Sequence, residues 1–141
     1  MRLVLDTSSL NISIGLWHDG QWLYHLDHVE SKFQQSKKVL RLVLEALQNA
    51  QLKPAQIEEV AVGIGPGSYT GLRVGLTVGK VWAYSMKIPL YSFSSSLLLQ
   101  RTRERKQEAE YPSVQFLEAQ DFQQVDRLSH LEPVYENDHF S

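Results

Sequence analysis

The residues most able to do chemistry gather between Gly63 and Gly79, a stretch that carries six of the chain's eight glycines. Glycine lets a ligand or a second backbone come close, and the free amides at the start of a helix can hold an anion. The hydroxyls of Ser68 and Thr70 lie beside such amides in this stretch. An anion site is therefore one hypothesis, although the residues alone favour a tight turn and helix cap without a ligand.

The spacing of these glycines departs from the known phosphate-binding patterns. A P-loop ending at Gly79-Lys80 would need a hydroxyl where Val81 stands. After Gly65-Pro66-Gly67, the next glycine comes one residue too late for a dinucleotide-binding fingerprint. Ser68 also lacks the flanking glycines of a nucleophile elbow, so we expect it to be structural. The sequence therefore predicts no catalytic residue and no cofactor in this stretch.

Asp6-Thr7-Ser8 forms a second candidate site, because it follows the apolar Leu3-Val4-Leu5, where a first strand should end. A turn in this position can present amides and hydroxyls to a phosphate, as it does in actin-like folds. Asp6, Thr7 and Ser8 are therefore weak candidates for nucleotide binding. Equally, Asp6 can cap the turn through its own neighbouring backbone without any ligand. Both interpretations stay open on the sequence alone.

Cationic and metal-ligating side chains give weaker signals. Arg73 lies one turn into a predicted helix, near its positive end, where a cation needs a carboxylate, a carbonyl or a ligand. A salt bridge to Asp6 or to a partner chain is the interpretation that we favour. His25 and His28 lie three apart near the end of a predicted strand, with no third ligand at a suitable spacing. We therefore predict no metal site.

Hydrophobic periodicity predicts the elements that position these residues. Apolar runs predict strands over residues 3–5, 12–17, 21–26, 57–64 and 89–93. Helical spacing predicts helices over residues 31–50 and 70–86. Asp19-Gly20 is a strong hairpin signal between the second and third strands, and Ser94-Ser95-Ser96 can cap a third helix. Ser31 and Gln34 have the spacing of a capping box, although Ser36 could begin the first helix instead.

The order of these elements predicts the fold class. Three meandering strands come first and helices link the later strands, so we predict an α/β domain with a mixed sheet. The sheet should hold about five strands, the first three antiparallel, with helices on its faces. The ribonuclease-H-like and actin-like ATPase folds share this order.

Both long predicted helices offer more apolar or flattened surface than one contact requires. Within 31–50, apolar residues mark two neighbouring faces, which suggests a cover on both sides. Within 70–86, small residues recur every four positions and form a smooth ridge, although each interior glycine costs about 1 kcal/mol of helix stability. The residues that we expect at a partner interface are Val39, Val43, Ala46, Gly71, Gly75, Gly79 and Ala83. Gly75→Leu should then prevent pairing and leave the protomer folded.

Composition excludes several classes of protein. The chain has 141 residues, a net charge of -2 and no cysteine, so disulfides and thiolate chemistry are excluded. No apolar run approaches the roughly 18 residues of a membrane span and the N-terminus does not read as a signal peptide, so we expect a cytoplasmic protein. Residues 1–100 carry nine Lys and Arg against seven Asp and Glu, and residues 101–141 carry five against nine. Neither part is a basic nucleic-acid surface, so we expect any RNA to be contacted through another subunit.

The motif at 63–75, Gly-Ile-Gly-Pro-Gly-Ser-Tyr-Thr-Gly-Leu-Arg-Val-Gly, strongly resembles the signature of the bacterial TsaB (YeaZ) family. That signature usually reads Gly-x-Gly-Pro-Gly-Ser-Phe-Thr-Gly-x-Arg-x-Gly. The opening Leu-Val-Leu-Asp-Thr-Ser and the later Pro-Leu-Tyr-Ser-Phe-Ser-Ser-Ser fit the same family, so the resemblance covers about residues 1–99. The motif residues are Gly65, Pro66, Gly67, Ser68, Tyr69, Thr70, Gly71 and Arg73.

The resemblance implies an actin-like fold and a role as a non-catalytic subunit. Members of the family pair with the threonylcarbamoyl transferase TsaD and act with the ATPase TsaE. The product is N6-threonylcarbamoyladenosine at position 37 of tRNA. By this resemblance, helices 31–50 and 70–86 would pair with matching helices of TsaD, or with a second copy when TsaD is absent. The tRNA would be contacted only through the complex.

The sequence departs from the family in two places. Phe33-Gln34-Gln35-Ser36 stands where relatives usually have His-Ser-Gln. After Leu99 only 42 residues remain, so we expect 1–99 to be an actin-like N-terminal subdomain and 100–141 a degenerate remnant of the second subdomain or a C-terminal extension. Pro133-Val134-Tyr135 resembles the family's closing Pro-x-Tyr. Actin-like proteins bind nucleotide between two subdomains, so we expect little or no ATP binding by this chain alone.

Two other functions remain open on the sequence. A small actin-like nucleotide-binding enzyme, or a peptidase-like protein of the kind sometimes attributed to the family, would carry chemistry of its own. A homodimeric interaction module would pair with itself and have no role in tRNA modification. We favour the scaffold subunit, because the two helix faces described above are what helix pairing requires.

Overall fold

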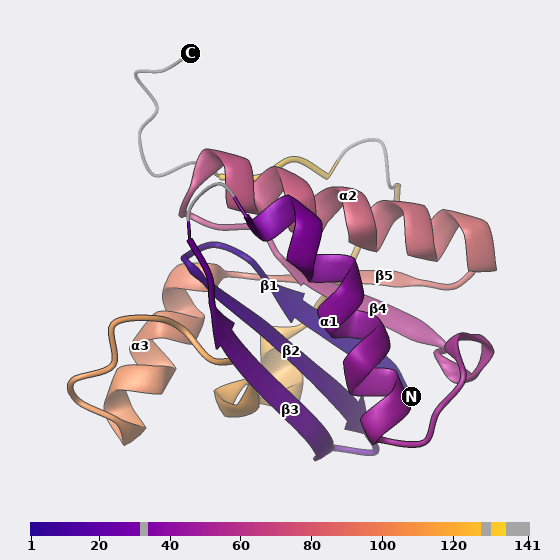
Figure 1. Ribbon diagram of the computed structural model, residues 1–141, viewed down its shortest axis with the longest axis horizontal. Helices are drawn as coiled ribbons and strands as arrows, with labels where there is room; N and C mark the ends of the chain where they lie inside the picture. The colour runs from indigo at the N-terminus through magenta and orange to yellow at the C-terminus, as the bar shows by residue number, and fades with distance from the viewer. Residues whose placement is uncertain (32–33, 128–130, 135–141) are drawn as a thin grey trace.

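The computed structural model describes residues 1–31, 34–127 and 131–134. The strands are β1 (Arg2–Asp6), β2 (Asn11–His18), β3 (Gln21–Val29), β4 (Glu59–Gly63), β5 (Leu90–Phe93) and β6 (Gln123–Gln124). The helices are α1 (Gln35–Asn49), α2 (Tyr69–Met86) and α3 (Ser95–Arg105), with short 3-10 turns η1 (Pro54–Gln56), η2 (Val114–Phe116) and η3 (Ala119–Asp121). The strands form one sheet in the order β3-β2-β1-β4-β5-β6 (Figure 1).

Strand directions confirm the predicted mixed sheet. β1 pairs in parallel with β4, and β4 pairs in parallel with β5, whereas β1–β2, β2–β3 and β5–β6 are antiparallel. The α/β class is therefore confirmed, and the sheet holds six strands rather than about five. The sixth strand escaped prediction because β6 consists of two exposed glutamines, which carry no apolar alternation.

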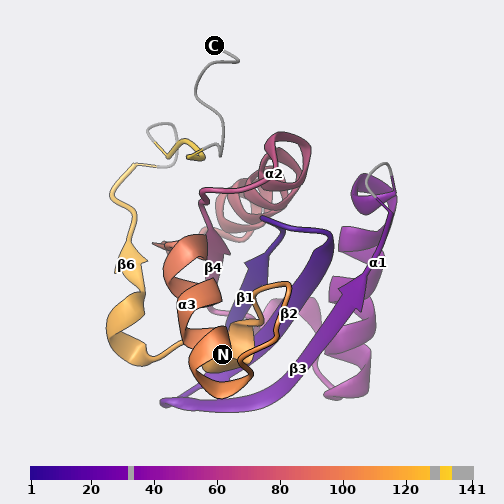
Figure 2. The same cartoon turned by 90° about the vertical axis from the view of Figure 1, so that its left-hand side faces the viewer.

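Helices α1 and α2 cover one face of the sheet, and α3 lies on the other (Figures 1 and 2). The first face is packed by apolar side chains that alternate along the strands, including Leu3 and Leu5 of β1 and Ile12 and Ile14 of β2. They meet the buried stripe of α1, represented by Val43, in one continuous core. This core holds α1 and α2 against the sheet, in which β4 leads into the glycine-rich stretch.

The chain after α3 closes the second face of the sheet. Val114 and Leu117 are almost fully buried there and pack in one cluster with Val4, Ala61 and Phe93. The predicted boundary between residues 99 and 100 therefore falls inside α3, and the parts of the chain on its two sides share one core. A division at that point would separate Val114 and Leu117 from the strand residues and from Leu98 of α3, with which they form one cluster.

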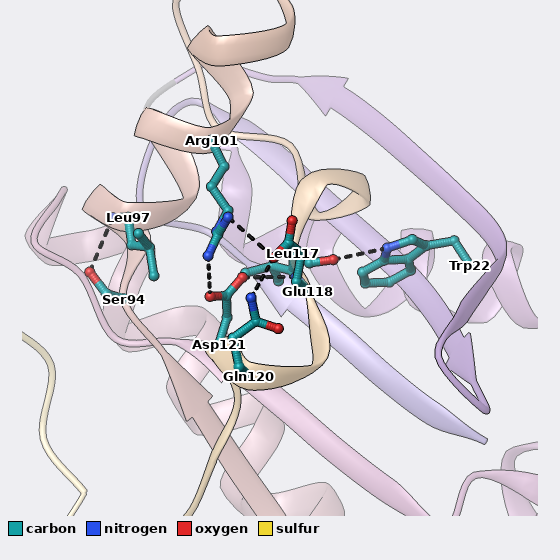
Figure 3. A network of polar contacts seen from close by, with 8 residues as sticks. All are labelled: Trp22, Ser94, Leu97, Arg101, Leu117, Glu118, Gln120 and Asp121. Carbon is teal, nitrogen blue, oxygen red and sulfur yellow. Dashed lines mark hydrogen bonds and ion pairs between the residues drawn. The ribbon is translucent and has the colours of Figure 1, made fainter.

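Polar contacts hold this C-terminal cover in place (Figure 3). Arg101 of α3 donates to Asp121 through Nη2 at 2.8 Å and lies 3.4 Å from Glu118 through Nη1. The indole Nε1 of Trp22 donates to the carbonyl of Leu117 at 3.4 Å. The hydrogen bond to Asp121, with the charges of both carboxylates, raises the pKa of Arg101. The guanidinium thus ties the helix to the turn that comes after it.

A further polar clamp joins the cover to β2 and β3. The Asp27 carboxylate accepts hydrogen bonds from Ser13 Oγ at 2.6 Å and from Ser113 Oγ at 2.8 Å. The amide of Val114 donates to the same Ser13 hydroxyl at 2.8 Å. Asn11 donates to both Asp27 and the carbonyl of residue 112, each at 3.0 Å. Side chains of β2 and β3 that point away from α1 therefore hydrogen-bond to the segment that leads into η2.

Helix starts agree with prediction at two of three helices. Ser68 Oγ accepts the Gly71 amide at the start of α2, and Ser94 Oγ accepts the Leu97 amide at the start of α3. The predicted Ser31 capping box is wrong, because α1 begins at Gln35 with Gln34 as N-cap and no side-chain cap. The alternative start at Ser36 is wrong for the same reason. Residues 32 and 33 lie outside the described residues.

One irregularity interrupts the β2–β3 ladder. Leu16 pairs with Tyr24 and Trp17 pairs with Trp22, so Leu23 faces no partner residue in β2. Residues two apart in a strand normally share a face. Here Trp22 packs in the cluster on the α3 side, whereas Tyr24 packs in the cluster on the α1 side. This bulge therefore lets one strand contribute to both layers.

Candidate functional site

The two sequence motifs meet at the carboxyl ends of the parallel strands. β1 ends at Asp6, β4 ends at Gly63 and β5 ends at Phe93, and these three strands are neighbours in the sheet. Open α/β sheets place their ligands at such an edge. The structure therefore brings together Asp6-Thr7-Ser8 and the glycine motif, and it adds Ser95, which the sequence assigned only to a helix cap.

Asp6 is the centre of a buried hydrogen-bond network. Its Oδ2 accepts from Ser8 Oγ at 2.7 Å and from the Ser8 amide at 3.3 Å, and its Oδ1 accepts from Ser95 Oγ at 2.7 Å. The Gly65 amide donates in turn to Ser95 Oγ at 3.0 Å. The Asp6 side chain has no exposed surface. Burial raises the pKa of Asp6, and the hydrogen bonds from Ser8 and Ser95 oppose that rise.

Thr7 joins this network to the start of α2. Its hydroxyl donates to the carbonyl of Gly71, and the Ser68 amide donates to the carbonyl of Ser8 at 2.8 Å. A Cβ at Gly75 would collide with the Thr7 side chain, so only glycine lets the helix lie this close. The turn after β1 is thus pressed against the first turns of α2.

These contacts favour one of the two interpretations left open for each motif. Asp6, Thr7 and Ser8 are buried, and both hydroxyls donate to protein oxygens. The two hydroxyls therefore leave no side-chain donor for a phosphate in this arrangement, and the assignment of the three residues to nucleotide binding stays a prediction that these contacts do not favour. The Ser8 amide closes on Asp6, which is the capped turn given as the alternative. Ser68 likewise uses its hydroxyl to cap α2, which matches the ligand-free alternative.

Residues 131–134 lie against the glycine stretch. The Val134 amide donates to the carbonyl of Ile64 at 2.6 Å, and Leu131 is buried in the core on the α2 side. Gly65 has φ +100°, and a Cβ there would collide with the Val134 carbonyl. The resemblance of Pro133-Val134-Tyr135 to the family's closing motif was the sequence signal for this contact. Tyr135 itself lies outside the described residues.

Arg73 lies on the outer side of α2, away from Asp6. It is exposed, its guanidinium lies 5.4 Å from the centre of the Tyr69 ring, and Nη1 donates to the Tyr69 hydroxyl at 3.4 Å. The predicted salt bridge to Asp6 is wrong, because the Asp6 oxygens accept from Ser8 and Ser95 instead. The two residues at i and i+4 form a stacked pair on the helix surface.

The seven residues expected at a partner interface are buried inside the protomer. They are Val39, Val43, Ala46, Gly71, Gly75, Gly79 and Ala83. The small-residue ridge faces the sheet, where Gly75 lies against Thr7 and Gly79 against Val62. That interface prediction is therefore wrong, and Gly75→Leu should unfold the protomer instead of separating a pair. The smooth ridge serves helix–sheet packing.

Other apolar side chains remain open on the outer faces of these helices. Leu40 and Leu44 of α1 are 51% and 47% exposed, and Val81 and Tyr84 of α2 are 58% and 79% exposed. Leu40 and Leu44 lie one turn apart, as do Val81 and Tyr84, so each pair forms one patch on its helix. The sequence did show the second apolar face of α1, but it could not show which face meets the sheet.

The described residues contain no group of three or more His, Asp or Glu side chains placed to hold a metal ion. His25 is exposed on β3, and His28 contacts Glu30 at 2.9 Å. None of the helices described is both long enough and apolar enough to cross a membrane.

Comparisons with known proteins agree on one group. A protein-family model described as TsaD, tRNA N6-adenosine threonylcarbamoyltransferase, matches residues 30–121. The tRNA threonylcarbamoyladenosine biosynthesis protein TsaB of Bacillus subtilis is 31% identical over 97 residues, covering 66% of this chain and 40% of its own length. The protein of the same name from Escherichia coli is 28% identical over 104 residues, covering 74% of this chain and 44% of its own. The chain thus spans less than half of these curated relatives.

A solved structure supports the fold. YeaZ from Pseudomonas aeruginosa superposes with a TM-score of 0.69 and 24% sequence identity, over 89% of this chain and 64% of that one. The likeness confirms the architecture of a mixed sheet with helices on its faces.

Proposed function

We propose a function from the premise that this chain belongs to the TsaB (YeaZ) family, within the group that the tRNA N6-adenosine threonylcarbamoyltransferase model describes. The chain takes part in the biosynthesis of threonylcarbamoyladenosine in tRNA as a non-catalytic scaffold. Its partner is a TsaD-like transferase subunit, assisted by a TsaE-like ATPase, and tRNA is bound by the complex.

The hydrogen bonds of the polar side chains in both sequence motifs support the non-catalytic role. A general acid, base or nucleophile must reach a substrate atom. Asp6 is fully buried, and the hydroxyls of Thr7 and Ser8 donate to protein oxygens. Ser68 caps α2. The polar groups of both motifs therefore position the turn and the helix, and the chemistry belongs to the partner.

The exposed apolar residues on the outer faces of α1 and α2 support a partner-binding surface on these two helices. Fully surface-exposed helices seldom carry large apolar residues in pairs without a cover, and such patches mark interaction sites. Leu40, Leu44, Val81 and Tyr84 are each about half exposed or more. The two helices lie on the same face of the sheet (Figure 1), so one partner can contact both.

A binding experiment with paired substitutions tests this proposal. The purified chain is mixed with the TsaD protein of its own organism, and the mass of the complex is measured by mass photometry or light scattering. We expect a heteromeric complex that is lost in Leu44→Asp combined with Val81→Asp, because two carboxylates would enter an apolar contact. Leu23→Asp is the matched control, since Leu23 is 54% exposed and belongs to β3 instead of either helix.

Two results would contradict the proposal. The first is the lack of any complex with the wild-type chain. The second is a complex that survives the α1 and α2 substitutions as well as it survives Leu23→Asp, since the apolar pairs would then play no part.

A further inference from the structure

β3 forms a long edge of the sheet. It runs over nine residues, Gln21–Val29, and β2 is its only neighbour among the described strands, so it is the outermost strand (Figure 1). An exposed edge presents unpaired N–H and C=O groups, and many proteins protect it with lysine, proline or a short length. β3 contains no lysine, arginine or proline. Its bulge at Leu23 lies near its beginning, so residues 24–29 remain regular and open to a further strand.

The outer side of β3 carries the backbone groups of His25, Asp27 and Val29. The Glu30 amide, directly after the strand, donates at 2.9 Å to the Leu10 carbonyl, which directly precedes β2. Backbone groups alternate in direction along a strand, so those of the even-numbered residues before Glu30 also face β2 and those of the odd-numbered ones face away. Among the described residues, no backbone hydrogen bond from another segment reaches these outward groups.

A second copy of β3 fits this edge in one register. An antiparallel two-fold pairing must set odd-numbered residues opposite odd-numbered ones, because their backbone groups face outward. Centred on Leu26, the pairing sets His25 opposite Asp27 and Leu23 opposite Val29. Leu23 and Val29 are 54% and 58% exposed, so this contact would cover the most exposed apolar side chains of the strand. Apolar pairs and pairs of complementary polar groups across strands both stabilise a sheet.

The neighbouring registers match less well. A pairing centred on His25 sets the two His25 side chains opposite each other and Leu23 opposite Asp27. One centred on Asp27 sets two carboxylates opposite each other, and like charges in that position destabilise a sheet. One centred on Tyr24 sets Leu23 opposite His25, so Leu23 gains no apolar partner. The strand is therefore complementary to itself about Leu26.

Asp27 can accept a further hydrogen bond without losing the contacts that it makes inside the protomer. Its Oδ1 accepts from Asn11 and Ser13, and its Oδ2 accepts from Ser113. A carboxylate offers about four lone-pair positions, so one on Oδ2 is left. The side chain is exposed, so His25 of a second copy can donate an imidazole N–H to it.

We propose that this chain pairs with a second copy of itself through β3, antiparallel and centred on Leu26, so that the two sheets join into one. Backbone hydrogen bonds supply the affinity, and the cross-strand pairs set the register. The inference goes beyond the proposed function and does not rest on it, because the paired residues belong to neither α1 nor α2.

A single introduced cysteine tests the register, because the chain has none of its own. In the proposed pairing the two Leu26 residues meet at a non-hydrogen-bonded position, with Cα atoms about 4.5 Å apart. Leu26→Cys should therefore form a disulfide-linked dimer under mild oxidation. His25→Cys is the matched control, because its counterpart is displaced by two residues, beyond the roughly 7 Å between Cα atoms that a disulfide can span. Faster cross-linking of His25→Cys than of Leu26→Cys would contradict the register.

Charge substitutions at His25 test the same contact without a cross-link. Sedimentation velocity of the full chain at micromolar concentrations should show a monomer–dimer equilibrium. His25→Asp sets carboxylates opposite Asp27 and should raise the dissociation constant about tenfold or more. His25→Lys keeps a complementary charge there and should stay within about threefold of the wild type. A register centred on His25 would give the opposite result for His25→Lys, because two lysines would meet.

Two sets of substitutions separate this surface from the proposed TsaD contact. Leu23→Asp places a carboxylate beside Val29, so it should weaken self-association while the chain still binds the TsaD protein. Leu44→Asp with Val81→Asp should have the reverse effects. Circular dichroism of each variant checks that it is folded.

The outcomes distinguish the inference from the proposed function. A chain that stays monomeric at high micromolar concentration would overturn the inference and leave the proposed function standing. So would a dimer that is indifferent to His25→Asp and is lost in Leu44→Asp. Self-association through β3 without any TsaD complex would overturn the proposed function alone. A monomeric chain whose TsaD complex is weakened by His25→Asp would show that a different protein adds to this edge, and it would overturn the pairing with a second copy.

Discussion

Burial makes the ionised form of Asp6 costly in the folded protein. In the unfolded chain the group titrates near its ordinary pKa of 3.8, and in the folded protein burial raises the pKa. Between these two pKa values the folded protein keeps a proton that the unfolded chain has released. The contribution of Asp6 to stability is therefore greatest below 3.8, and it falls as the pH rises through this window.

Asp6→Asn should remove this dependence on pH. The asparagine oxygen can accept from one serine and its NH2 can donate to the oxygen of the other, so Ser8 and Ser95 keep partners. We expect the free energy of unfolding of the variant, relative to wild type, to rise from pH 4 upward. The slope should reach up to about 1.4 kcal/mol per pH unit inside the window. Urea unfolding at pH 4, 5, 6, 7 and 8 measures it.

Ser95→Ala provides the companion measurement. The Ser95 hydroxyl lowers the pKa of Asp6, so its removal should raise that pKa further. The free energy of unfolding should then continue to fall up to a higher pH than in the wild type. A difference between Asp6→Asn and wild type that stays constant from pH 4 to 8 would show that Asp6 does not titrate in this way.

At the scale of single residues, the sequence identified the residues that meet at the site. It did not show whether their side chains face a ligand or other groups of the protein. Asp6-Thr7-Ser8 and the glycine motif do meet at one edge of the sheet. A serine at the start of a helix can cap it or bind an anion with the same hydroxyl, and an aspartate after a strand can close its own turn or face a ligand. Only the positions of Ser95 and Gly71, which are remote in sequence from Asp6 and Thr7, settle the outcome.

At the scale of the elements, the contact between α2 and the end of β1 depends on the absence of a side chain at Gly75. A Cβ there would collide with Thr7, whose hydroxyl also holds the carbonyl of Gly71. Helix propensity alone favours alanine over glycine by about 1 kcal/mol. Overpacking a tight contact typically costs about 1–3 kcal/mol, and here a backbone hydrogen bond is at stake as well.

Gly75→Ala should therefore destabilise the protein, by roughly 1–2 kcal/mol after the gain in propensity. Thr77→Ala on the exposed side of the same helix is the control, and it should stabilise by a few tenths of a kcal/mol. Thermal or urea unfolding of the three proteins measures both effects. Equal stability of Gly75→Ala and Thr77→Ala would mean that α2 can move away from Thr7 at little cost.

Helix existence was predictable here, whereas helix orientation was not. The apolar periodicity of α1 and α2 predicted both elements to within a few residues. A ridge of small residues, however, suits close packing on a helix or on a sheet equally well. The choice is made by Thr7, in the turn after β1, and by Val62, in the strand that precedes α2, because both lie directly against the ridge in the folded protein. The residues expected at a partner interface are consequently buried against the sheet, and the pairs Leu40–Leu44 and Val81–Tyr84 are the ones left exposed.

At the scale of the whole molecule, the second face of the sheet depends on residues beyond α3. Val114 is fully buried and Leu117 is 3% exposed, and both pack with strand residues of the N-terminal half. Burial of one such side chain contributes about 1.5–3 kcal/mol, while whole domains are stable by about 5–15 kcal/mol. Loss of this cover would therefore remove a large share of the total stability.

A fragment of residues 1–105, which keeps α3 whole, should fail to fold cooperatively. A fragment of residues 1–127 keeps η2, η3 and β6 and loses, among the described residues, the segment 131–134 with the contacts of Leu131 and Val134. It should therefore give a single unfolding transition at a lower midpoint than the full chain. Circular dichroism melts and the dispersion of amide proton signals measure both fragments. A well-dispersed, cooperatively melting 1–105 would support the division at residue 99 that the sequence suggested.

This C-terminal cover was hidden from the sequence for a physical reason. Its apolar residues come in short groups without periodicity, and its attachment relies on single polar contacts such as Ser113 with Asp27 and Asp121 with Arg101. Periodicity predicts regular elements, but it says nothing of irregular segments that fit a surface made by distant strands.

The unpaired Leu23 has a consequence for how this chain can vary. The extra residue in β3 places Trp22 on the α3 side of the sheet and Tyr24 on the α1 side. Deleting Leu23 alone would keep Trp22 opposite Trp17 and Tyr24 opposite Leu16, so an unbroken ladder would hold both rings on their present faces. Lineages of this protein should therefore accept a β3 without this extra residue, whereas an insertion or deletion elsewhere in the strand would move the side chains beyond it to the opposite face.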